Sequence, residues 1–315
     1  MKAAALVLFG SLVMSLLFVC LTVPAYAQSV ASAGVQSASN QSLRAMEAAG
    51  VKMTFDVVSV KLNNSGGGSH SNVPLGPGDP FSRTGGLFSV TNVPLQPIIA
   101  WAFDLSGDQQ LRLNAELPKW TFADRFDIDA KAAGNPGQPE MQLMVQSLLA
   151  DRFKLAVHTE TKKGPIFALE MVKPGKLGLQ LTPHVSDPSC SAPTAGASAA
   201  CVSGLRQMPP SVPGLIRYHG QNVPVSIIAK YLPLTSTWGT GLERPVVDKT
   251  GLSGNFDFTI EFVRQLDPDA RAQQPDQNGP TFIEALRDQL GLKLDSQTGS
   301  ATVLVIDHIE EPAPN

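Results

Sequence analysis

The stretch Asn92-Val93-Pro94 occurs again 130 positions later, as Asn222-Val223-Pro224. In both places a strand-like run comes before it, and apolar residues at helical spacing follow it. Further along, Arg125-Phe126-Asp127-Ile128 matches Asn255-Phe256-Asp257-Phe258 at the same offset, without a gap. A repeat of this length favours two duplicated domains over a solenoid.

The repeated pattern predicts the same βαββαβ-type unit twice. Helices are expected where apolar residues recur every three or four positions. In the first copy these residues are Leu95, Ile98, Ile99, Ala102 and Phe103, followed by Met141, Met144, Val145, Leu148 and Leu149. In the second copy they are Val225, Ile228, Ala229 and Leu232, followed by Phe282, Ile283, Leu286 and Leu290. The expected fold is α+β, with helices packed on one face of mixed or antiparallel sheets.

Strands are predicted from alternating and β-branched segments. Residues 155–159 and 166–172 are expected to form a hairpin, with Lys163-Gly164-Pro165 as its turn. Other expected strands are 55–61 at the edge of the first sheet, 111–117, 126–130 and 302–306.

The composition divides the chain into five parts. They are a signal peptide at residues 1–27, a flexible segment at 28–50, the first α+β repeat at 51–175, a Pro/Ser/Ala-rich linker at 176–213 and the second repeat at 214–312. Cys190 and Cys201 both lie in the linker. An even pair of cysteines in an exported chain favours a disulfide between them.

The N-terminus has the features of a leader peptide. Lys2 precedes the apolar residues 3–23, and Ala25-Tyr26-Ala27 has the small-x-small pattern of a cleavage site before Gln28. The expected location is therefore the periplasm or the extracellular space. The alternative is an uncleaved leader that anchors the chain in the inner membrane, because the apolar stretch is long enough to span a bilayer.

The charge balance argues against nucleic acid as a partner. The chain has 24 Lys and Arg against 27 Asp and Glu, and its basic residues form no cluster. Neutralising phosphates requires a basic face. A weakly acidic protein of this kind is not expected to bind DNA or RNA.

Several segments together resemble a known family. They are residues 55–61, 125–131, 149–159 with 165–172, Pro245-Val246-Val247-Asp248-Lys249-Thr250-Gly251-Leu252, and 304–312. The chain resembles the soil-associated family of exported proteins found chiefly in Acidobacteria, a domain of unknown function. The resemblance implies an exported, multicopy protein, with some members attached to membrane metallopeptidase sensor domains. It supplies no catalytic residues.

Each half alone has a second, weaker resemblance. A strand that ends in Asn-Val-Pro, a helix, two strands and a second helix are similar to the short N-terminal domains of secretins and TonB-dependent receptors. That resemblance implies a periplasmic protein-interaction module, by analogy of fold alone.

No catalytic, cofactor-binding or metal-ligating constellation is indicated. The five histidines, His70, His158, His184, His219 and His308, lack the spacing of a helical metal site. Asp307 is next to His308, but neighbours on a regular strand point to opposite faces and cannot form one dyad. Asp127 and Asp129 share a face, yet their alternation with apolar residues is typical of the solvated side of a strand.

The most sharply defined short motif is Asp248-Lys249-Thr250-Gly251. It is either a ligand contact or a turn in which Asp248 accepts local backbone hydrogen bonds and Gly251 has a positive φ. The turn is the favoured interpretation. Trp101, Trp120 and Trp238 are candidates for a recognition surface, although Trp101 is expected in the core.

Export, duplication, modest charge and absent catalytic spacing favour a non-enzymatic binding or protein-interaction module of the cell envelope. The expected partner is another envelope protein or a cell-wall or polysaccharide ligand, with no cofactor, and with membrane contact only through an uncleaved leader. One alternative is a secreted hydrolase whose site assembles from loops 63–86 and 236–254. The other is a sensory or regulatory domain.

Overall fold

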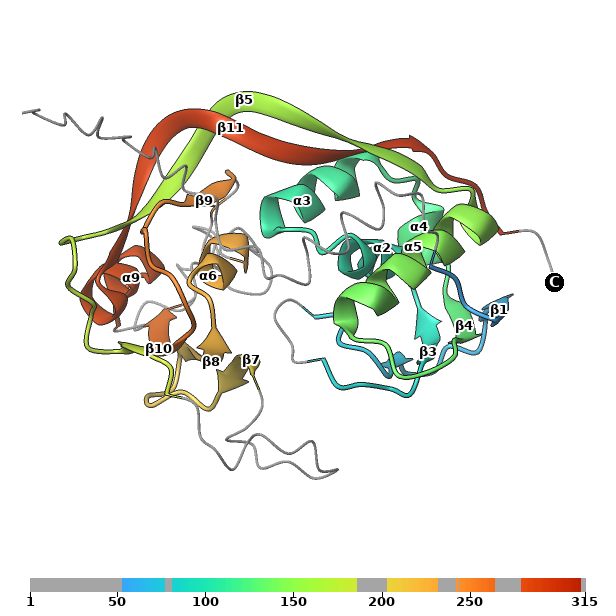
Figure 1. Cartoon of the computed structure of the whole chain (residues 1–315), viewed down its shortest axis with the longest axis horizontal. Coiled ribbons are helices and arrows are strands. Elements are labelled where there is room, and N and C mark those ends of the chain that lie inside the picture. Colours follow the sequence, from blue (N-terminus) through green and yellow to red (C-terminus); the bar gives the residue numbers. More distant parts are fainter. Residues whose placement is uncertain are drawn as a thin grey trace, which may run out of the picture. The chain divides into compact units, whose positions relative to one another are not determined.

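The computed structural model describes residues 53–76, 81–185, 203–231, 242, 244–263 and 279–312. The predicted leader with its Ala27–Gln28 cleavage site, the segment 28–50, the pair Cys190 and Cys201, and Trp238 lie outside these residues. The described part combines helices with mainly antiparallel sheets, which confirms the predicted α+β class (Figure 1). In chain order the elements are β1 (Val57–Leu62), β2 (His70–Ser71), β3 (Leu87–Val93), α2 (Leu95–Ala102), α3 (Gly107–Glu116), α4 (Trp120–Ala123), β4 (Phe126–Lys131), α5 (Gln138–Phe153), β5 (Ala156–Met171), β6 (Leu181–Pro183), β7 (Gly204–Met208), β8 (Leu215–Val223), α6 (Ser226–Tyr231), β9 (Val246–Asp248), β10 (Phe256–Val263), α9 (Phe282–Leu290) and β11 (Leu292–His308).

Two four-stranded sheets have their strands in corresponding order. The first sheet runs β1-β4-β3-β2 and the second β6-β10-β8-β7, with antiparallel neighbours throughout. β1 lies at the edge of the first sheet, as predicted. The matching order agrees with two related units, while duplication of the sequence stays a prediction.

Both sheets contain the same corner at the repeated asparagine. Asn92 and Asn222 have φ angles of 55° and 52°, in the left-handed region that residues other than glycine rarely adopt. The backbone N–H of Asn92 donates to Asp127 Oδ1, and that of Asn222 donates to Asp257 Oδ1, at 2.8 Å in each case. In each sheet the regular pairing is interrupted beside this contact. The carboxylate therefore holds the end of the strand in the conformation from which the chain continues into the next helix.

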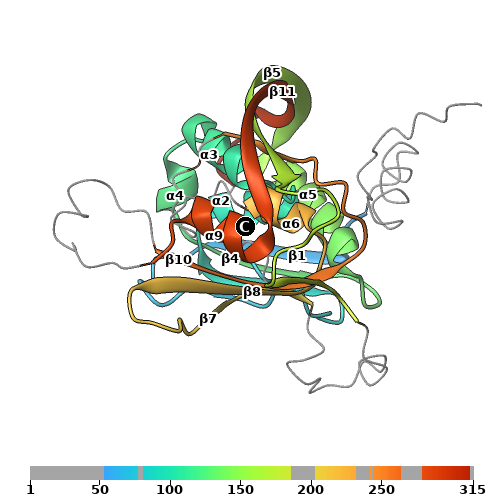
Figure 2. The same cartoon turned by 90° about the vertical axis from the view of Figure 1, so that its left-hand side faces the viewer.

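The helices lie on the same side of the sheets (Figure 2). Residues of α2 and α5 are buried in the hydrophobic core of the first sheet, and residues of α6 and α9 in the core of the second. The predicted helical faces of α2 and α5 are confirmed, with Ile98, Ile99 and Leu149 inaccessible to solvent. Ile283 is an exception, because it is exposed on α9 while Phe282 and Leu286 fill the core.

β5 and β11 form a long two-stranded ribbon in place of the expected hairpin. Residues 155–159 and 166–172 belong to one continuous strand, so the hairpin prediction is wrong. Lys163-Gly164-Pro165 continues the strand, and β5 pairs antiparallel with β11 along almost its whole length. The Gly-Pro pair is typical of a turn, but the partner strand lies far along the chain and overrides this local preference.

The two ends of the ribbon belong to different hydrophobic cores. Leu155 and Leu304 pack in the core of the first sheet, whereas Leu169 and Leu292 pack in the core of the second. Each strand therefore begins in the core of its own repeat and ends in the core of the other. The expected division into residues 51–175 and 214–312 is crossed by both strands.

Two further expectations differ from the structure. Residues 111–117 are not a strand, since α3 covers most of them. The N–H of Ser106 donates to Gln109 Oε1 at 2.9 Å, which caps this helix, but Leu113 is its only buried large apolar residue and the helical period is weak. The linker at 176–213 contains β6 and β7, which complete the second sheet.

Candidate functional site

A cluster of charged side chains joins the two strands at one end of the ribbon. His158 Nδ1 lies 2.9 Å from the Asp307 carboxylate, and its Nε2 lies 3.2 Å from Glu160 Oε1. These hydrogen bonds, first that of Asp307 and then that of Glu160, raise the pKa of His158 above 6.5. The bonds from His158 and from Lys162 lower the pKa of Glu160. Asp307 thus contacts an imidazole across the ribbon and not its neighbour His308.

This charged cluster does not have the geometry of a catalytic or metal site. The side chains of His158, Glu160 and Asp307 are 47%, 43% and 47% exposed. Water screens such charges, and catalysis depends on groups that are held in a preorganised, water-excluded site. Within the described ranges, no three His, Cys, Asp or Glu side chains are arranged to hold a metal ion.

The other candidate acids and imidazoles connect neighbouring strands. Asp127 accepts a second hydrogen bond from Asn63 Nδ2 at 2.7 Å, and Asp129 accepts one from a hydroxyl of β3 at 2.6 Å. In the second sheet His184 Nδ1 lies 2.8 Å from Asp257. It holds this carboxylate as Asn63 holds the carboxylate in the first sheet. Asp127 and Asp257 stabilise the two sheet corners, whereas Asp129 links β4 to β3 within the regular pairing. These groups do not converge on a common substrate position.

The motif Asp248-Lys249-Thr250-Gly251 forms a turn after β9. The backbone N–H and the hydroxyl of Thr250 donate to Asp248 Oδ1 at 2.9 Å and 2.8 Å, and Gly251 has a φ of 70°. Lys249 Nζ lies 2.7 Å from Gln297 Oε1 of β11. The polar atoms of the motif are thus used within the chain, which is the geometry of a structural turn.

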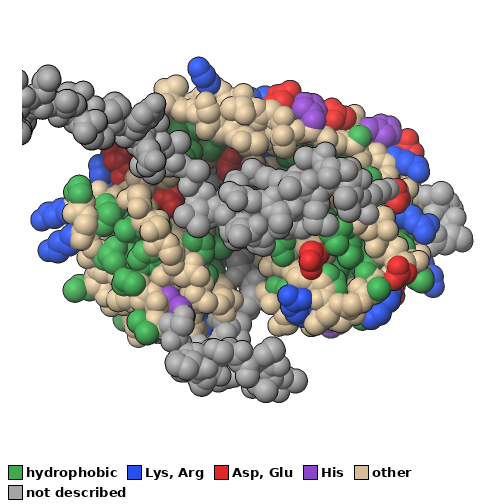
Figure 3. All heavy atoms as spheres, in the orientation of Figure 1, with side chains coloured by type: hydrophobic (Ala, Val, Ile, Leu, Met, Phe, Trp, Pro, Cys, Tyr) green, Lys and Arg blue, Asp and Glu red, His purple; other side chains and the backbone are tan. Residues whose placement is uncertain are grey.

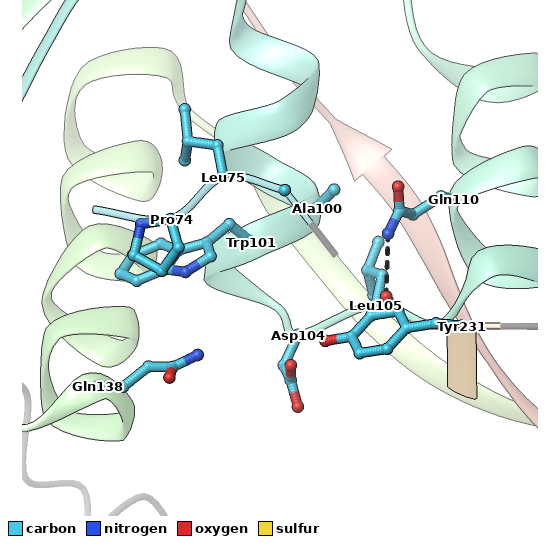
Figure 4. Close-up of a pocket in the computed structure, with 10 residues that line it drawn as sticks. Pro74, Leu75, Ala100, Trp101, Asp104, Leu105, Gln110, Gln138 and Tyr231 are labelled. Atoms are coloured by element: carbon cyan, nitrogen blue, oxygen red, sulfur yellow. Dashed lines mark hydrogen bonds between the residues drawn. The ribbon is translucent and has the colours of Figure 1, made fainter. Parts of the chain in front are cut away.

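A small hollow lies beside the end of α2 (Figure 4). Its lining includes the buried Trp101, Tyr231 and residues 74–76 of the loop 63–86, but no described residue of the loop 236–254. Its volume of about 30 Å³ is far below the ~300–1,000 Å³ of small-molecule sites. The carboxylate in the lining, Asp104, forms an ion pair with Lys230. The hollow therefore lacks both the space and the free acid or base of a hydrolase site.

The backbone of the ribbon provides a different kind of site. In an antiparallel pair, every second residue directs its N–H and C=O away from the partner strand. Val172 N–H donates to Gly291 O at 2.9 Å, so Val172 and Gly291 form a hydrogen-bonded pair. Hydrogen-bonded and non-hydrogen-bonded pairs alternate along an antiparallel ribbon. The next facing pair, Leu292 and Met171, therefore does not exchange backbone hydrogen bonds. Leu292 and every second residue after it therefore direct their backbone groups outward. One of these carbonyls, that of Thr302, accepts a hydrogen bond from a side chain of α3 at 2.9 Å.

The outer edge of β5 is protected against further pairing. Phe167 N–H and Leu169 C=O bond to the segment around β9, at 2.8 Å and 2.9 Å. Pro165 occupies the next outward position and has no N–H to offer. Lys163 occupies the one after that and is charged. Strand pairing, proline and lysine are the devices by which natural sheets prevent unwanted edge-to-edge contact.

The outer edge of β11 has none of these devices over the same length. Ser296, Thr298 and Ser300 are its outward positions, and their side chains are exposed. No charged residue and no proline occurs in residues 296–306. Because the sheet order is β11-β5-β9, the outward backbone groups at these three positions have no strand partner within the described chain. We refer to residues 296–300 as the open edge.

The open edge lies on an accessible part of the molecule. In Figures 1 and 2 the middle of the ribbon is an outer layer, beyond the helices. Figure 3 shows mainly uncharged polar surface there, whereas acidic and histidine side chains gather towards one end of the ribbon. The open edge has two neighbours: Arg244, whose guanidinium donates to Ser296 Oγ at 3.1 Å, and α3, which bonds to the next outward carbonyl at Thr302.

The sequence contains a signal for this site that no local motif marks. Residues 296–306 contain no charge and no proline, while residues 160–165 contain three charged side chains and Pro165. The contrast is informative only once the two segments are known to pair. Lys163-Gly164-Pro165 instead predicted a turn within β5, so this pairing was not expected.

The chain was compared with protein families, with curated proteins and with solved structures. Residues 96–309 match the family described as "Protein of unknown function (DUF3738)". No curated protein and no solved structure matches significantly. Among the described elements, no helix combines the length and the apolar character needed to cross a membrane.

Proposed function

Because the chain belongs to the DUF3738 family, a family of unknown function, we propose its role from its own structure. It is a non-enzymatic interaction module, exported to the cell envelope, that binds an extended polypeptide strand along the open edge of β11. The export part of this proposal is supported by the leader-like residues 1–27.

The observation that carries the proposal is the contrast between the two edges of one ribbon. Pairing with β9, Pro165 and Lys163 protect β5, while the open edge presents unpaired N–H and C=O groups at Ser296, Thr298 and Ser300. An added strand takes its affinity from main-chain hydrogen bonds of this kind. An unprotected edge is a template for pairing, and natural proteins protect the edges that they do not use.

A polypeptide fits this surface better than a polysaccharide or a small molecule. The outward groups recur at every second residue, which is the repeat of another β-strand. The one hollow described above is too small for a typical ligand. The charged cluster around His158 is exposed and internally paired, so it does not supply the acid and base that the hydrolase alternative requires.

The experiment is selection of extended peptides on the purified protein, followed by hydrogen exchange of the complex. We expect captured peptides to slow exchange of the amides of Ser296, Thr298 and Ser300. Residues 296–306 are uncharged, so salt should change the affinity mainly through Arg244 and Lys249, which bond to Ser296 and Gln297. Captured peptides that leave exchange of these amides unchanged would refute the proposed site.

A matched pair of variants tests the role of the backbone. Ser300 and Lys163 face each other in the ribbon, and both direct their N–H outward. Ser300→Pro removes one donor from the open edge and should weaken peptide binding roughly 5- to 10-fold, as expected for one hydrogen bond. Lys163→Pro makes the same change on the protected edge and should leave binding unchanged. Equal effects of the two variants would show that the open edge is not the site.

A further inference from the structure

We propose that the strand bound at the open edge is β11 of a second copy of this chain. This inference rests on the proposed function and names the partner of the same site. Two copies would pair antiparallel about a two-fold axis, to give the continuous strand order β5-β11-β11-β5. A two-fold contact of this kind uses the same surface on both copies and is the commonest symmetry of protein dimers.

The positions of the outward backbone groups define a register for this pairing. Hydrogen-bonded positions must coincide with outward residues on both copies. With Thr298 facing Thr298 of the partner subunit, Ser296 faces Ser300 of the partner subunit, and the reverse holds on the other side of the axis. These three facing pairs use all the outward groups of the open edge. The carbonyl of Thr302, which is already bonded to α3, lies beyond them.

The side chains are compatible with this register. Thr298 meets its own copy, and Ser296, whose hydroxyl accepts from Arg244 at 3.1 Å, meets a serine. Cross-strand pairs of hydroxyl side chains stabilise sheets. On the other face of the ribbon, Gln297 meets Gly299, and Asp295 meets Ala301. No charge faces a like charge in these pairs, so the open edge can pair with an antiparallel copy of itself.

The outer edge of β5 is not suited to the same two-fold pairing, which argues for specificity of the β11 edge. A two-fold pairing of β5 about Lys163 would place Pro165 against Thr161, where one donor is missing, and Lys163 against its own copy. Over residues 296–300 the ribbon is an outer layer of the molecule (Figure 2), and the added pairing ends where α3 bonds to the carbonyl of Thr302. Only one of the two edges of the ribbon therefore permits self-association.

The decisive experiment is sedimentation of charge variants at Thr298, separately and mixed, at low salt. The unmodified protein should form a dimer whose fraction rises with concentration. Thr298→Lys and Thr298→Glu each place like charges in contact and should weaken the dimer by roughly tenfold or more. Mixing the two variants should restore a dimer that contains one copy of each. Both substitutions keep the backbone N–H and an exposed side chain, and circular dichroism of each variant checks that it is folded.

The possible outcomes separate this inference from the proposed function. Restoration of the mixed dimer supports both. A dimer that neither charge variant weakens overturns the inference, because the contact then lies elsewhere. A protein that stays monomeric, yet captures peptides that protect the open edge, overturns the inference and supports the proposed function. A monomer that captures no peptide overturns both.

Discussion

β5 and β11 are paired along nearly their whole length, yet their outer edges have opposite properties. β5 contains a proline in the middle of a 16-residue strand, and β11 contains the uncharged run Ser296-Gln297-Thr298-Gly299-Ser300. Pro165 is tolerated because its position directs the missing N–H outward, where no bond to β11 is lost. One position earlier or later, the proline would remove a hydrogen bond of the ribbon. The direction of each residue's backbone N–H and C=O groups therefore decides whether an edge is open or protected.

The two strands differ in the middle and are alike at their ends. Leu169 fixes β5 in the second core, and Leu304 fixes β11 in the first. The buried ends anchor the ribbon in the two cores. The middle is not constrained by burial, so the outer edges of its two strands can differ. This comparison can be tested in the two cores, within one facing pair and at the charged end.

The largest effect is expected from shortening the buried ends. Leu169→Ala and Leu304→Ala should each lower the free energy of unfolding by ~2–5 kcal/mol, because both side chains are buried in a core. Thr161→Ala changes an exposed side chain of the same ribbon and should stay within about 0.5 kcal/mol. Urea unfolding of the three variants measures these values. A Leu169→Ala variant as stable as Thr161→Ala would mean that β5 does not reach the second core.

A smaller effect is expected within the facing pair Gly299 and Gly164. A Cβ on Gly299 would lie 2.3 Å from Cδ1 and 3.0 Å from Cγ1 of the buried Ile166, whereas a Cβ on Gly164 would meet no atom within 4 Å. Gly299→Ala should therefore cost about 1–3 kcal/mol. Gly164→Ala, its matched control, should change stability by no more than about 0.5 kcal/mol. Thermal unfolding compares the two, and equal costs would contradict the packing of Ile166 against β11.

Much of the fold could be predicted from the sequence where the signal is local. The apolar stripes of α2 and α5 and the alternation of β4 each depend on a few neighbouring residues, and all three elements were expected. The expected strand 302–306 is only the apolar end of β11. The rest of that strand has a polar composition and is a strand because β5 lies beside it. Long-range pairing of this kind leaves little trace in local periodicity.

The candidate site was harder to predict than the fold, for a related reason. Ser296, Thr298 and Ser300 have no chemistry of their own that would mark them as functional. Their significance comes from the direction of their backbone groups, which depends on the register with β5. His158 and Asp307 present the same difficulty, because they lie 149 positions apart and meet only through that register. Groups brought together by a ribbon between distant segments cannot be recognised by spacing.

The smallest effect is expected at the charged end, where His158 of β5 meets Asp307 of β11. The hydrogen bond that His158 donates to Asp307 is the first cause of the raised pKa of His158, and the one that it donates to Glu160 is the second. Asp307→Asn should therefore lower this pKa further than Glu160→Gln does, as measured by NMR titration of the imidazole. His308→Gln changes the neighbouring imidazole and should leave the titration of His158 as it is.

The sign of the pH dependence follows from the direction of this shift. The folded state holds the proton of His158 more tightly than the unfolded chain, whose histidine has a pKa of about 6.5. The contribution of this contact to stability is therefore fully present below pH 6.5 and is lost as the pH rises through the raised pKa. The protection of amides near His158 and Asp307, measured against the exchange rate of an unstructured peptide at the same pH, should fall over that pH range in the unmodified protein and not in Asp307→Asn. Because residues 296–300 carry no titratable group, protection of their amides should not follow this titration. If both regions changed together, the charged end and the open edge would be coupled, and the ribbon would act as one unit and not as two separate regions.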